Sequence, residues 1–230
     1  MQRKSGPPLT AVNASSTTEQ VAEALRTAIV QGKLAQGEQL SEATLAPTLR
    51  VSKGSVREAL LMLVGDRLVD HRPRQGFFVA QLDGDDIREL YEVRLAIEAS
   101  AGHLMIAKQD VSIVDALKGH LERFREAVAA GDWPAIGDAD LQFHQMFVSG
   151  ARNTRLDRVM SLLLYETRIC MANFEGRYER PADLVAEHEG LIRALELQDE
   201  TLLTRLQRQH MEGAVRRLSS LASSSDTAGD

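Results

Sequence analysis

The sequence of 230 residues has a single cysteine, Cys170, which excludes a disulfide within the chain and a cysteine-rich zinc site. It also lacks any apolar run close to the roughly 20 residues that a membrane-spanning helix needs. Residues 1–14 lack the apolar core of a secretory signal peptide. These absences argue against a membrane protein or an exported, disulfide-stabilised protein, so we expect a soluble protein of the cytoplasm.

Negatively charged residues are scarce in the first third of the chain and abundant in the rest. The formal net charge is −6, but residues 1–80 hold ten Lys and Arg against seven Asp and Glu. Residues 81–230 therefore carry a charge of about −9. A mildly basic part joined to an acidic part favours an anionic partner at one end only.

Residues 16–80 show the order of a winged helix-turn-helix domain. Ser16 and Glu19 have capping-box spacing at the start of a first helix, and two further apolar stripes predict two more helices. Two short β-type runs, 68–69 and 77–79, lie on either side of a turn. We predict three helices followed by a two-stranded hairpin.

The sequence after residue 81 has no further strand signal. Helical patterns cover residues 84–108, 111–130, 134–150, 154–174, 181–197 and 200–222. Six helices with short connections predict an antiparallel bundle domain over 81–222. The expected fold is thus mainly α, with a disordered arm at 1–15 and a disordered tail at 223–230.

The segment 51–60 has the character of a DNA-recognition helix. Its first turn is small and polar, and Lys53 and Arg57 can reach base edges or phosphates. The free N–H groups at the helix N-terminus favour a phosphate as well, and a cationic hairpin tip suits a wing on the DNA backbone. The candidate DNA-binding residues are Ser52, Lys53, Gly54, Ser55, Arg57, Arg72, Arg74 and Gly76. The alternative is a small helical domain whose exposed cations are merely solvated.

Four polar residues fall on the apolar faces of three expected helices. Asp140 and His144 are four residues apart on one face, and His188 and His210 lie within the apolar stripes of later helices. One carboxylate and three imidazoles suit a divalent metal, Zn first and Ni, Mn or Fe as alternatives. Each histidine alone is better explained as a core residue bonded to a backbone carbonyl; the set of four favours the metal.

Arg94 occupies the centre of an apolar stripe, where a guanidinium needs an anion. Glu98, one turn later, can supply that anion as a structural ion pair, and a small carboxylate ligand is the functional alternative. Arg168 is a weaker candidate of the same kind, for which a surface salt bridge is the alternative.

The motifs of the first part resemble the winged-helix domain of GntR-family bacterial transcription regulators. The residues that carry the resemblance are Gly32, Leu34, Gly37, Leu40-Ser41-Glu42, Leu45-Ala46, the Val51 to Leu60 run, Leu68-Val69 and Arg74-x-Gly76. Three departures concern Lys53, where the family usually has Arg, Ser55, where Pro or Thr is common, and Arg67, where it usually has Gly. Lys53 offers a point charge in place of a bidentate fork, and Arg67 would be strained in a left-handed turn.

The second part resembles the all-helical FCD effector domain of the FadR-type subfamily. The matching residues are Tyr91-Glu92-Val93-Arg94, Glu98, Asp140-x3-His144, Asn153, Glu187-His188 and His210. The resemblance implies one divalent metal per chain, held by Asp140, His144, His188 and His210. It also implies a small organic or sugar acid beside the metal, and the candidate ligand-binding residues are Arg94, Glu98, Asn153 and Arg168. A homodimeric repressor of palindromic operator DNA is the regulator that the resemblance implies.

Two other functions fit parts of the sequence. A metal-dependent hydrolase would use the histidines to activate water, but no separate general base has a clear place and the winged helix would be unexplained. A ligand-blind nucleoid protein would need a larger basic surface than residues 1–80 offer. We therefore expect a ligand-responsive regulator with no catalytic residues.

Overall fold

The computed structural model describes residues 17–171 and 181–225. The predicted capping residue Ser16, the arm at 1–15 and the last five residues of the predicted tail lie outside this range. Residues 223–225 do not belong to a disordered tail, because the last helix continues through them.

The first part of the chain is a winged helix-turn-helix unit. Its elements are α1 (Thr17–Val30), β1 (Gln39–Leu40), α2 (Glu42–Leu49), α3 (Lys53–Gly65), β2 (Val69–Arg72) and β3 (Gly76–Val79). The expected hairpin pairs Val69 with Val79, and β1 adds a third antiparallel strand in the order β1-β3-β2. A strand of two residues is too short to produce an alternating pattern, so the sequence did not predict it.

The core of this unit forms where the helix stripes meet the sheet. Val21 and Leu25 of α1, Leu60 of α3 and Phe77 of β3 are buried in one apolar cluster. Arg67, in the turn between α3 and β2, has a φ of 57°. This left-handed conformation is costly for a residue with a Cβ, as the substitution of the usual glycine suggested.

The second part is a bundle of the six expected helices. They are α4 (Gly84–Ala107), α5 (Val114–Ala130), α6 (Trp133–Gly150), α7 (Thr154–Met171), α8 (Pro181–Glu196) and α9 (Glu200–Ser225). Local signals set the boundaries. Asp83 and Asp86 form a capping box at α4, Gly131 ends α5 with a φ of 66°, and Asp132 caps α6.

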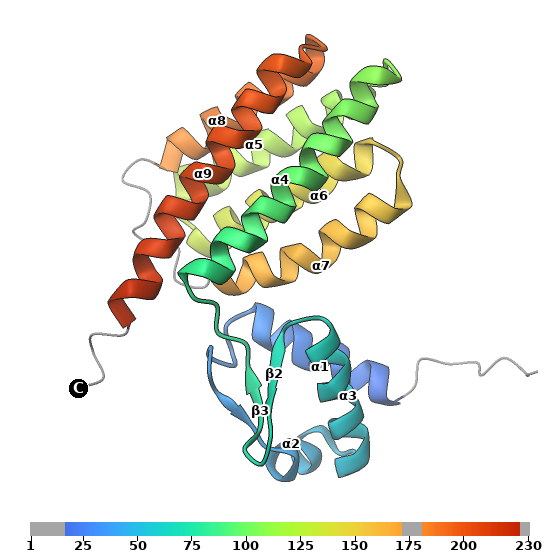
Figure 1. Cartoon of the computed structure of the whole chain (residues 1–230), viewed down its shortest axis with the longest axis vertical. Coiled ribbons are helices and arrows are strands. Elements are labelled where there is room, and N and C mark those ends of the chain that lie inside the picture. Colours follow the sequence, from blue (N-terminus) through green and yellow to red (C-terminus); the bar gives the residue numbers. More distant parts are fainter. Residues whose placement is uncertain (1–16, 172–180, 226–230) are drawn as a thin grey trace, which may run out of the picture.

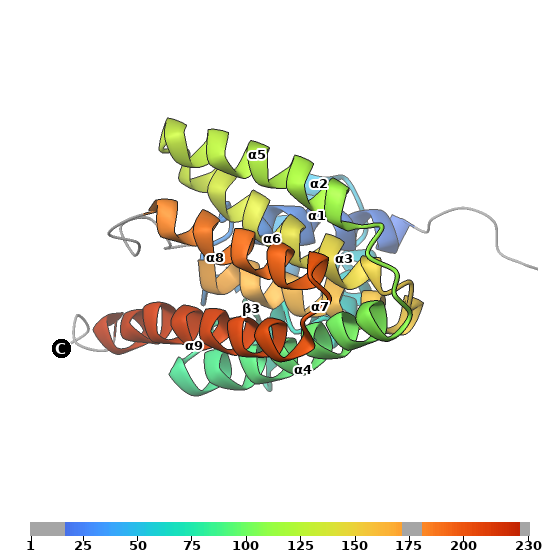
Figure 2. The ribbon, with the colours of Figure 1, turned by 90° about the horizontal axis from the view of Figure 1, so that it is seen from above.

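The bundle lies beside the winged-helix unit, with α7 nearest to α1 (Figure 1). Seen from above, α5 lies on one side of the bundle and α4 and α9 run next to each other on the other, with α6 and α8 between them (Figure 2). A Cβ at Gly102 of α4 would lie 2.7 Å from Leu203 of α9, so the glycine allows this close packing.

One residue of α7 belongs to the core of the other unit. Ile169 is buried in the apolar cluster of the winged-helix unit, and its carbonyl accepts a hydrogen bond of 2.8 Å from Gln36 Nε2. Helix α7 therefore connects the bundle to the winged-helix unit by packing as well as by chain. Within the described residues, the structure has no helix long and apolar enough to cross a membrane.

Candidate metal centre and DNA-binding surface

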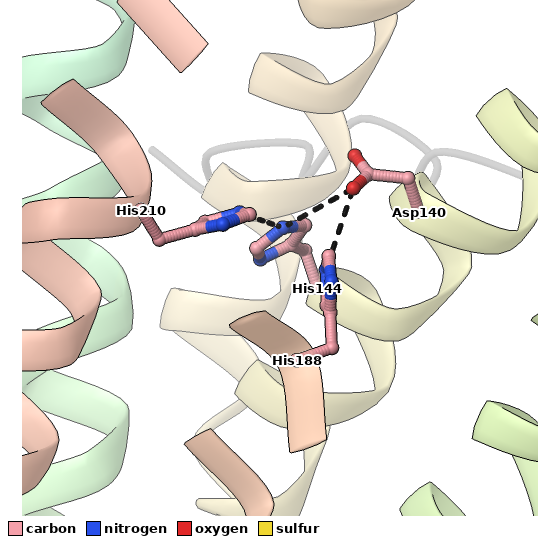
Figure 3. A group of neighbouring side chains, drawn as sticks. All are labelled: Asp140, His144, His188 and His210. Atoms are coloured by element: carbon pink, nitrogen blue, oxygen red, sulfur yellow. Dashed lines mark hydrogen bonds and ion pairs between the residues drawn. The ribbon is translucent and has the colours of Figure 1, made fainter. Parts of the chain in front are cut away.

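The structure brings the four predicted metal ligands together where α6, α8 and α9 meet (Figure 3). Asp140 and His144 come from α6, His188 from α8 and His210 from α9. All four side chains are buried, and one ligand atom from each lies within 4.8 Å of the others. The spacing of four residues on α6 therefore places a carboxylate and an imidazole in one cluster with two distant histidines.

Each imidazole donates the hydrogen of its Nδ1 outward, away from the cluster. His144 donates to Glu98 Oε2 and His210 to Glu187 Oε2, both at 2.7 Å, and His188 donates to the Leu184 carbonyl at 2.7 Å. Carboxylate and carbonyl oxygens accept only, so in the neutral form that binds a metal the hydrogen of each ring lies on Nδ1. The three Nε2 atoms are left with lone pairs that point inward.

The inward-facing atoms have no satisfactory partners among themselves. His144 Nε2 lies 3.1 Å from His210 Nε2, and His188 Nε2 lies 3.3 Å from Asp140 Oδ1. His188 Nε2 is buried and makes no hydrogen bond with the described residues. A tetrahedral site with bonds of about 2.0–2.1 Å would separate neighbouring ligand atoms by about 3.3 Å. The donor set and its spacing therefore fit a divalent cation.

Burial and charge favour the ligand forms of these groups. Burial acts to raise the pKa of Asp140, but the contact with the His188 imidazole opposes burial most strongly, and the pKa lies well below its usual range. Burial and the nearby Arg94 guanidinium hold the pKa of His144 well below the ordinary value. Asp140 is thus a carboxylate and His144 is neutral, which are the states that bind a metal.

Arg94 and Glu98 form the outer support of the cluster. Arg94 Nη2 lies 3.2 Å from Glu98 Oε1, and the other oxygen of Glu98 binds His144. Both side chains are 1% exposed. Burial raises the pKa of Glu98 and the Arg94 charge opposes that shift. The structural ion pair that the sequence allowed is therefore present, while Arg94 Nε is buried without a hydrogen bond to the described residues.

The structure gives the other two candidate ligand-binding residues different surroundings. Asn153 Oδ1 accepts hydrogen bonds from the backbone N–H groups of Arg155 and Leu156, so this side chain caps the first turn of α7. Arg168 pairs with Asp138 and lines a cleft against the winged-helix unit. Neither residue belongs to the group formed by the four clustered side chains.

Two further histidines have partners outside the cluster. His120 is buried and its Nε2 donates to the Ala139 carbonyl at 2.7 Å. His103 is exposed and lies 2.8 Å from Glu200. Sequence reasoning assigned no site role to Glu187, the partner of His210. Glu187 is adjacent to His188 in the chain. Its side chain is 32% exposed and does not lie within an apolar stripe, so the helical pattern could not identify it as a partner of the cluster.

The predicted DNA-binding residues lie at one end of the winged-helix unit. Ser52 caps α3 by accepting a hydrogen bond of 3.0 Å from the Ser55 backbone, and Lys53 and Gly54 are exposed in the first turn. Arg57 is 56% exposed and pairs with Glu42 Oε1 at 3.0 Å. These groups form a polar N-terminal turn with two accessible cations.

The hairpin tip lies next to this turn. Arg74 and Gly76 have φ values of 66° and 100°, and Arg72 lies over the Phe78 ring at 4.4 Å. A groove of about 410 Å³ is lined by Lys53 of α3 and by Arg74 and Gly76 of the hairpin, among others. The structure thus brings the first turn of α3 and the wing tip to a common groove, although they are about twenty residues apart.

Comparisons with known proteins agree with this architecture. The family description of bacterial regulatory proteins of the gntR family matches residues 17–79, and that of the FCD domain matches residues 89–213. A solved structure of a GntR transcriptional regulator from Rhodococcus sp. RHA1 superposes with a TM-score of 0.77 at 30% identity. It covers 90% of this chain and 99% of its own.

Curated relatives have the same character. A transcriptional regulator of the helix-turn-helix type from Paraburkholderia xenovorans (strain LB400) is 30% identical over 90% of this chain and 87% of its own length. The gluconate operon transcriptional repressor of Bacillus subtilis (strain 168) is 27% identical over 86% of this chain and 83% of its own. The chain therefore belongs to the GntR family, carries an FCD domain, and is a DNA-binding transcription regulator and not an enzyme.

Proposed function

We propose that the chain is a metal-dependent repressor whose operator binding responds to a small organic or sugar acid. In this proposal Asp140, His144, His188 and His210 hold one divalent cation per chain, with Zn the first candidate. The acid binds beside the cation, and Arg94 provides a positive charge for its carboxylate.

The observation that supports the metal is the orientation of the three imidazoles. Every Nδ1 hydrogen is used by an outer acceptor, which directs three Nε2 lone pairs and the Asp140 carboxylate toward one point. Without a cation, His144 and His210 would place the lone pairs of two ring nitrogens 3.1 Å apart with no hydrogen between them. Buried polar groups of this kind are costly unless they are paired or bind a metal.

The bound cation would supply a positive charge, and expansion beyond the four protein ligands would give positions for ligand oxygen atoms. Arg94 would add a second charge from α4, and Glu98 would hold both Arg94 and His144 in place. A buried guanidinium with an unused Nε is suited to donate a charge-assisted hydrogen bond to a carboxylate. The gluconate operon repressor, whose name refers to a sugar acid, supports this class of effector.

On the DNA side, we infer that the eight exposed or half-exposed residues at α3 and the wing contact an operator. Ser52, Lys53, Gly54, Ser55 and Arg57 would enter the major groove, and Arg72, Arg74 and Gly76 would lie on the backbone. A homodimer would present two such surfaces to a palindromic site, and the two halves of the dimer would fix their spacing. A regulator of this kind acts in the cytoplasm, where the DNA lies.

The experiment is a shift assay on the DNA upstream of the gene, titrated with a panel of metabolite carboxylates with and without a chelator. We expect sequence-selective binding that at least one carboxylate weakens, and we expect the chelator to remove this response. Arg94→Ala should lose the response while the operator affinity without ligand stays close to wild type. Arg88→Ala is the matched control, because Arg88 lies on the same helix with 55% of its side chain exposed.

The size of the Arg94 effect follows from the loss of a buried charge pair, about 2–5 kcal/mol, or about 30-fold to several thousand-fold in ligand affinity. An Arg94→Ala variant that responds like wild type would leave Arg94 as a structural partner of Glu98 only. A panel without any active carboxylate would overturn the effector proposal.

A further inference from the structure

A cleft of about 570 Å³ separates α1 of the winged-helix unit from α6 and α7 of the bundle. Its lining includes Arg26, Thr27, Trp133, Asp138, Tyr165 and Arg168. Ligand sites typically have volumes of about 300–1,000 Å³ and are frequent at domain interfaces. The described lining residues include none of the four clustered metal ligands, so the cleft is separate from the proposed metal centre.

The charges of the cleft are arranged by depth. The guanidinium groups lie inside, because the side chains of Arg26 and Arg168 are 15% and 21% exposed. Their acidic partners lie at the mouth, because Glu23 and Asp138 are 66% and 65% exposed. Arg26 is balanced further by Asp66, whose oxygen lies 2.6 Å away. The deep polar chemistry of the cleft is therefore cationic, and its rim is acidic.

Arg168 is the less well balanced of the two deep cations. Its ion pair is with the exposed Asp138, and its Nε is buried without a hydrogen bond to the described residues. Burial lowers the pKa of Arg168, which reflects the cost of the charge at this position. Gly137 lies against it: a Cβ there would be 3.3 Å from Arg168 Nη1. An external carboxylate can replace Asp138 and release that side chain into water.

Aromatic side chains line the same cleft as this cation. Tyr165 and Trp133 both line the cleft, and the Arg26 guanidinium lies over the Tyr165 ring at 5.3 Å from its centroid. Flat rings pack well against aromatic and guanidinium faces. We propose that the cleft is a second ligand site that binds a small aromatic carboxylate, with its carboxylate on Arg168 and its ring against Trp133 and Tyr165.

Such a ligand would contact both units of the protein at once. Arg26 and Thr27 belong to α1, whereas Trp133 and Arg168 belong to α6 and α7. A ligand that binds one relative arrangement of the two units better than another shifts the population toward it. The site therefore provides an input to DNA binding that is separate from the metal centre.

Trp133 is the single tryptophan of the chain, so it is a natural reporter of the cleft. The experiment is a titration of the full-length protein with benzoate, followed by tryptophan fluorescence, in the presence of a chelator. We expect a saturable change, and we expect Arg168→Gln to weaken it by about tenfold or more through loss of a charge-assisted hydrogen bond. Thr27→Met, which fills the cleft from the α1 side, should weaken it as well. The exposed Arg205 lies on α9, and Arg205→Gln should bind benzoate like wild type.

Circular dichroism checks that each variant is folded. If Arg168→Gln does not fold, Thr27→Met still tests the proposal. The proposal is overturned if benzoate gives no saturable change, or if folded Arg168→Gln and Thr27→Met both bind like wild type. It is also overturned if benzylamine binds and benzoate does not, because the rim and not the deep cation would then select the ligand. Benzoate binding that continues in the presence of the chelator distinguishes this site from the metal-centred effector site. If the proposal of a metal-centred effector site fails, the expected benzoate result stays the same.

Discussion

The histidine cluster and the DNA-binding surface hold their charged groups in opposite ways. In the cluster, Asp140, His144 and His188 are buried, and the two imidazoles are held by outer hydrogen bonds to Glu98 and the Leu184 carbonyl. On the DNA-binding surface, Lys53 and Arg57 are exposed, and Arg57 is held by one ion pair with Glu42. The comparison shows that a buried site needs support from several helices. An exposed site needs only cations that can exchange water or a neighbouring carboxylate for a DNA phosphate.

The largest expected effect tests the support of the cluster. Glu98→Gln should lower the free energy of unfolding by about 3–5 kcal/mol, because it leaves the buried Arg94 without a counter-charge. Glu187→Gln is the matched control, since Glu187 also binds a clustered histidine but is 32% exposed. It should cost only about 0–1 kcal/mol, as partly solvated pairs do. Urea denaturation of chelator-treated protein measures both values.

Equal losses for Glu98→Gln and Glu187→Gln would contradict the contrast between a buried and an exposed support. The fluorescence titration of the cleft between α1, α6 and α7 tests a third environment, in which the Arg168 cation is partly buried and its partner Asp138 is exposed.

A smaller effect tests the exposed side of the comparison. Lys53→Ala or Arg57→Ala should weaken specific operator binding by about 1–3 kcal/mol if the side chain reads a base. The free energy of unfolding should change by less than about 0.5 kcal/mol, because both side chains are exposed. Lys118→Ala is the control: Lys118 is an exposed cation of the bundle that pairs with Glu196. If both variants keep the affinity and the base preference of the wild type, α3 is not the recognition helix.

Periodicity predicted most of the fold, because helices with one buried face repeat their apolar residues at a fixed spacing. The same argument predicted the four-residue cluster, since a polar residue inside an apolar stripe such as His188 must face the core. It did not predict β1, which is too short to show a pattern. It also could not place Arg168, whose neighbours come from α1 and α6. Contacts between distant segments depend on packing that one sequence does not display.

Partners of the candidate ligands were harder to predict than the ligands themselves. Glu98 was expected either as an ion-pair partner of Arg94 or as a ligand contact, and it supports both Arg94 and His144. The Leu184 carbonyl that orients His188 has no sequence signature, because every residue carries a carbonyl. Asn153 resembles a ligand contact by motif, but its side chain caps α7.

The central claim is that the buried cluster holds a metal, and elemental analysis of the purified chain tests it most directly. We expect about one divalent ion per chain, with His188→Ala and His210→Ala losing the ion and its stabilisation together. At a metal concentration about 1,000 times the Kd, that stabilisation would be about 4 kcal/mol. Wild-type protein without metal, and without any thermal shift on addition of Zn, Ni or Mn, would contradict the account.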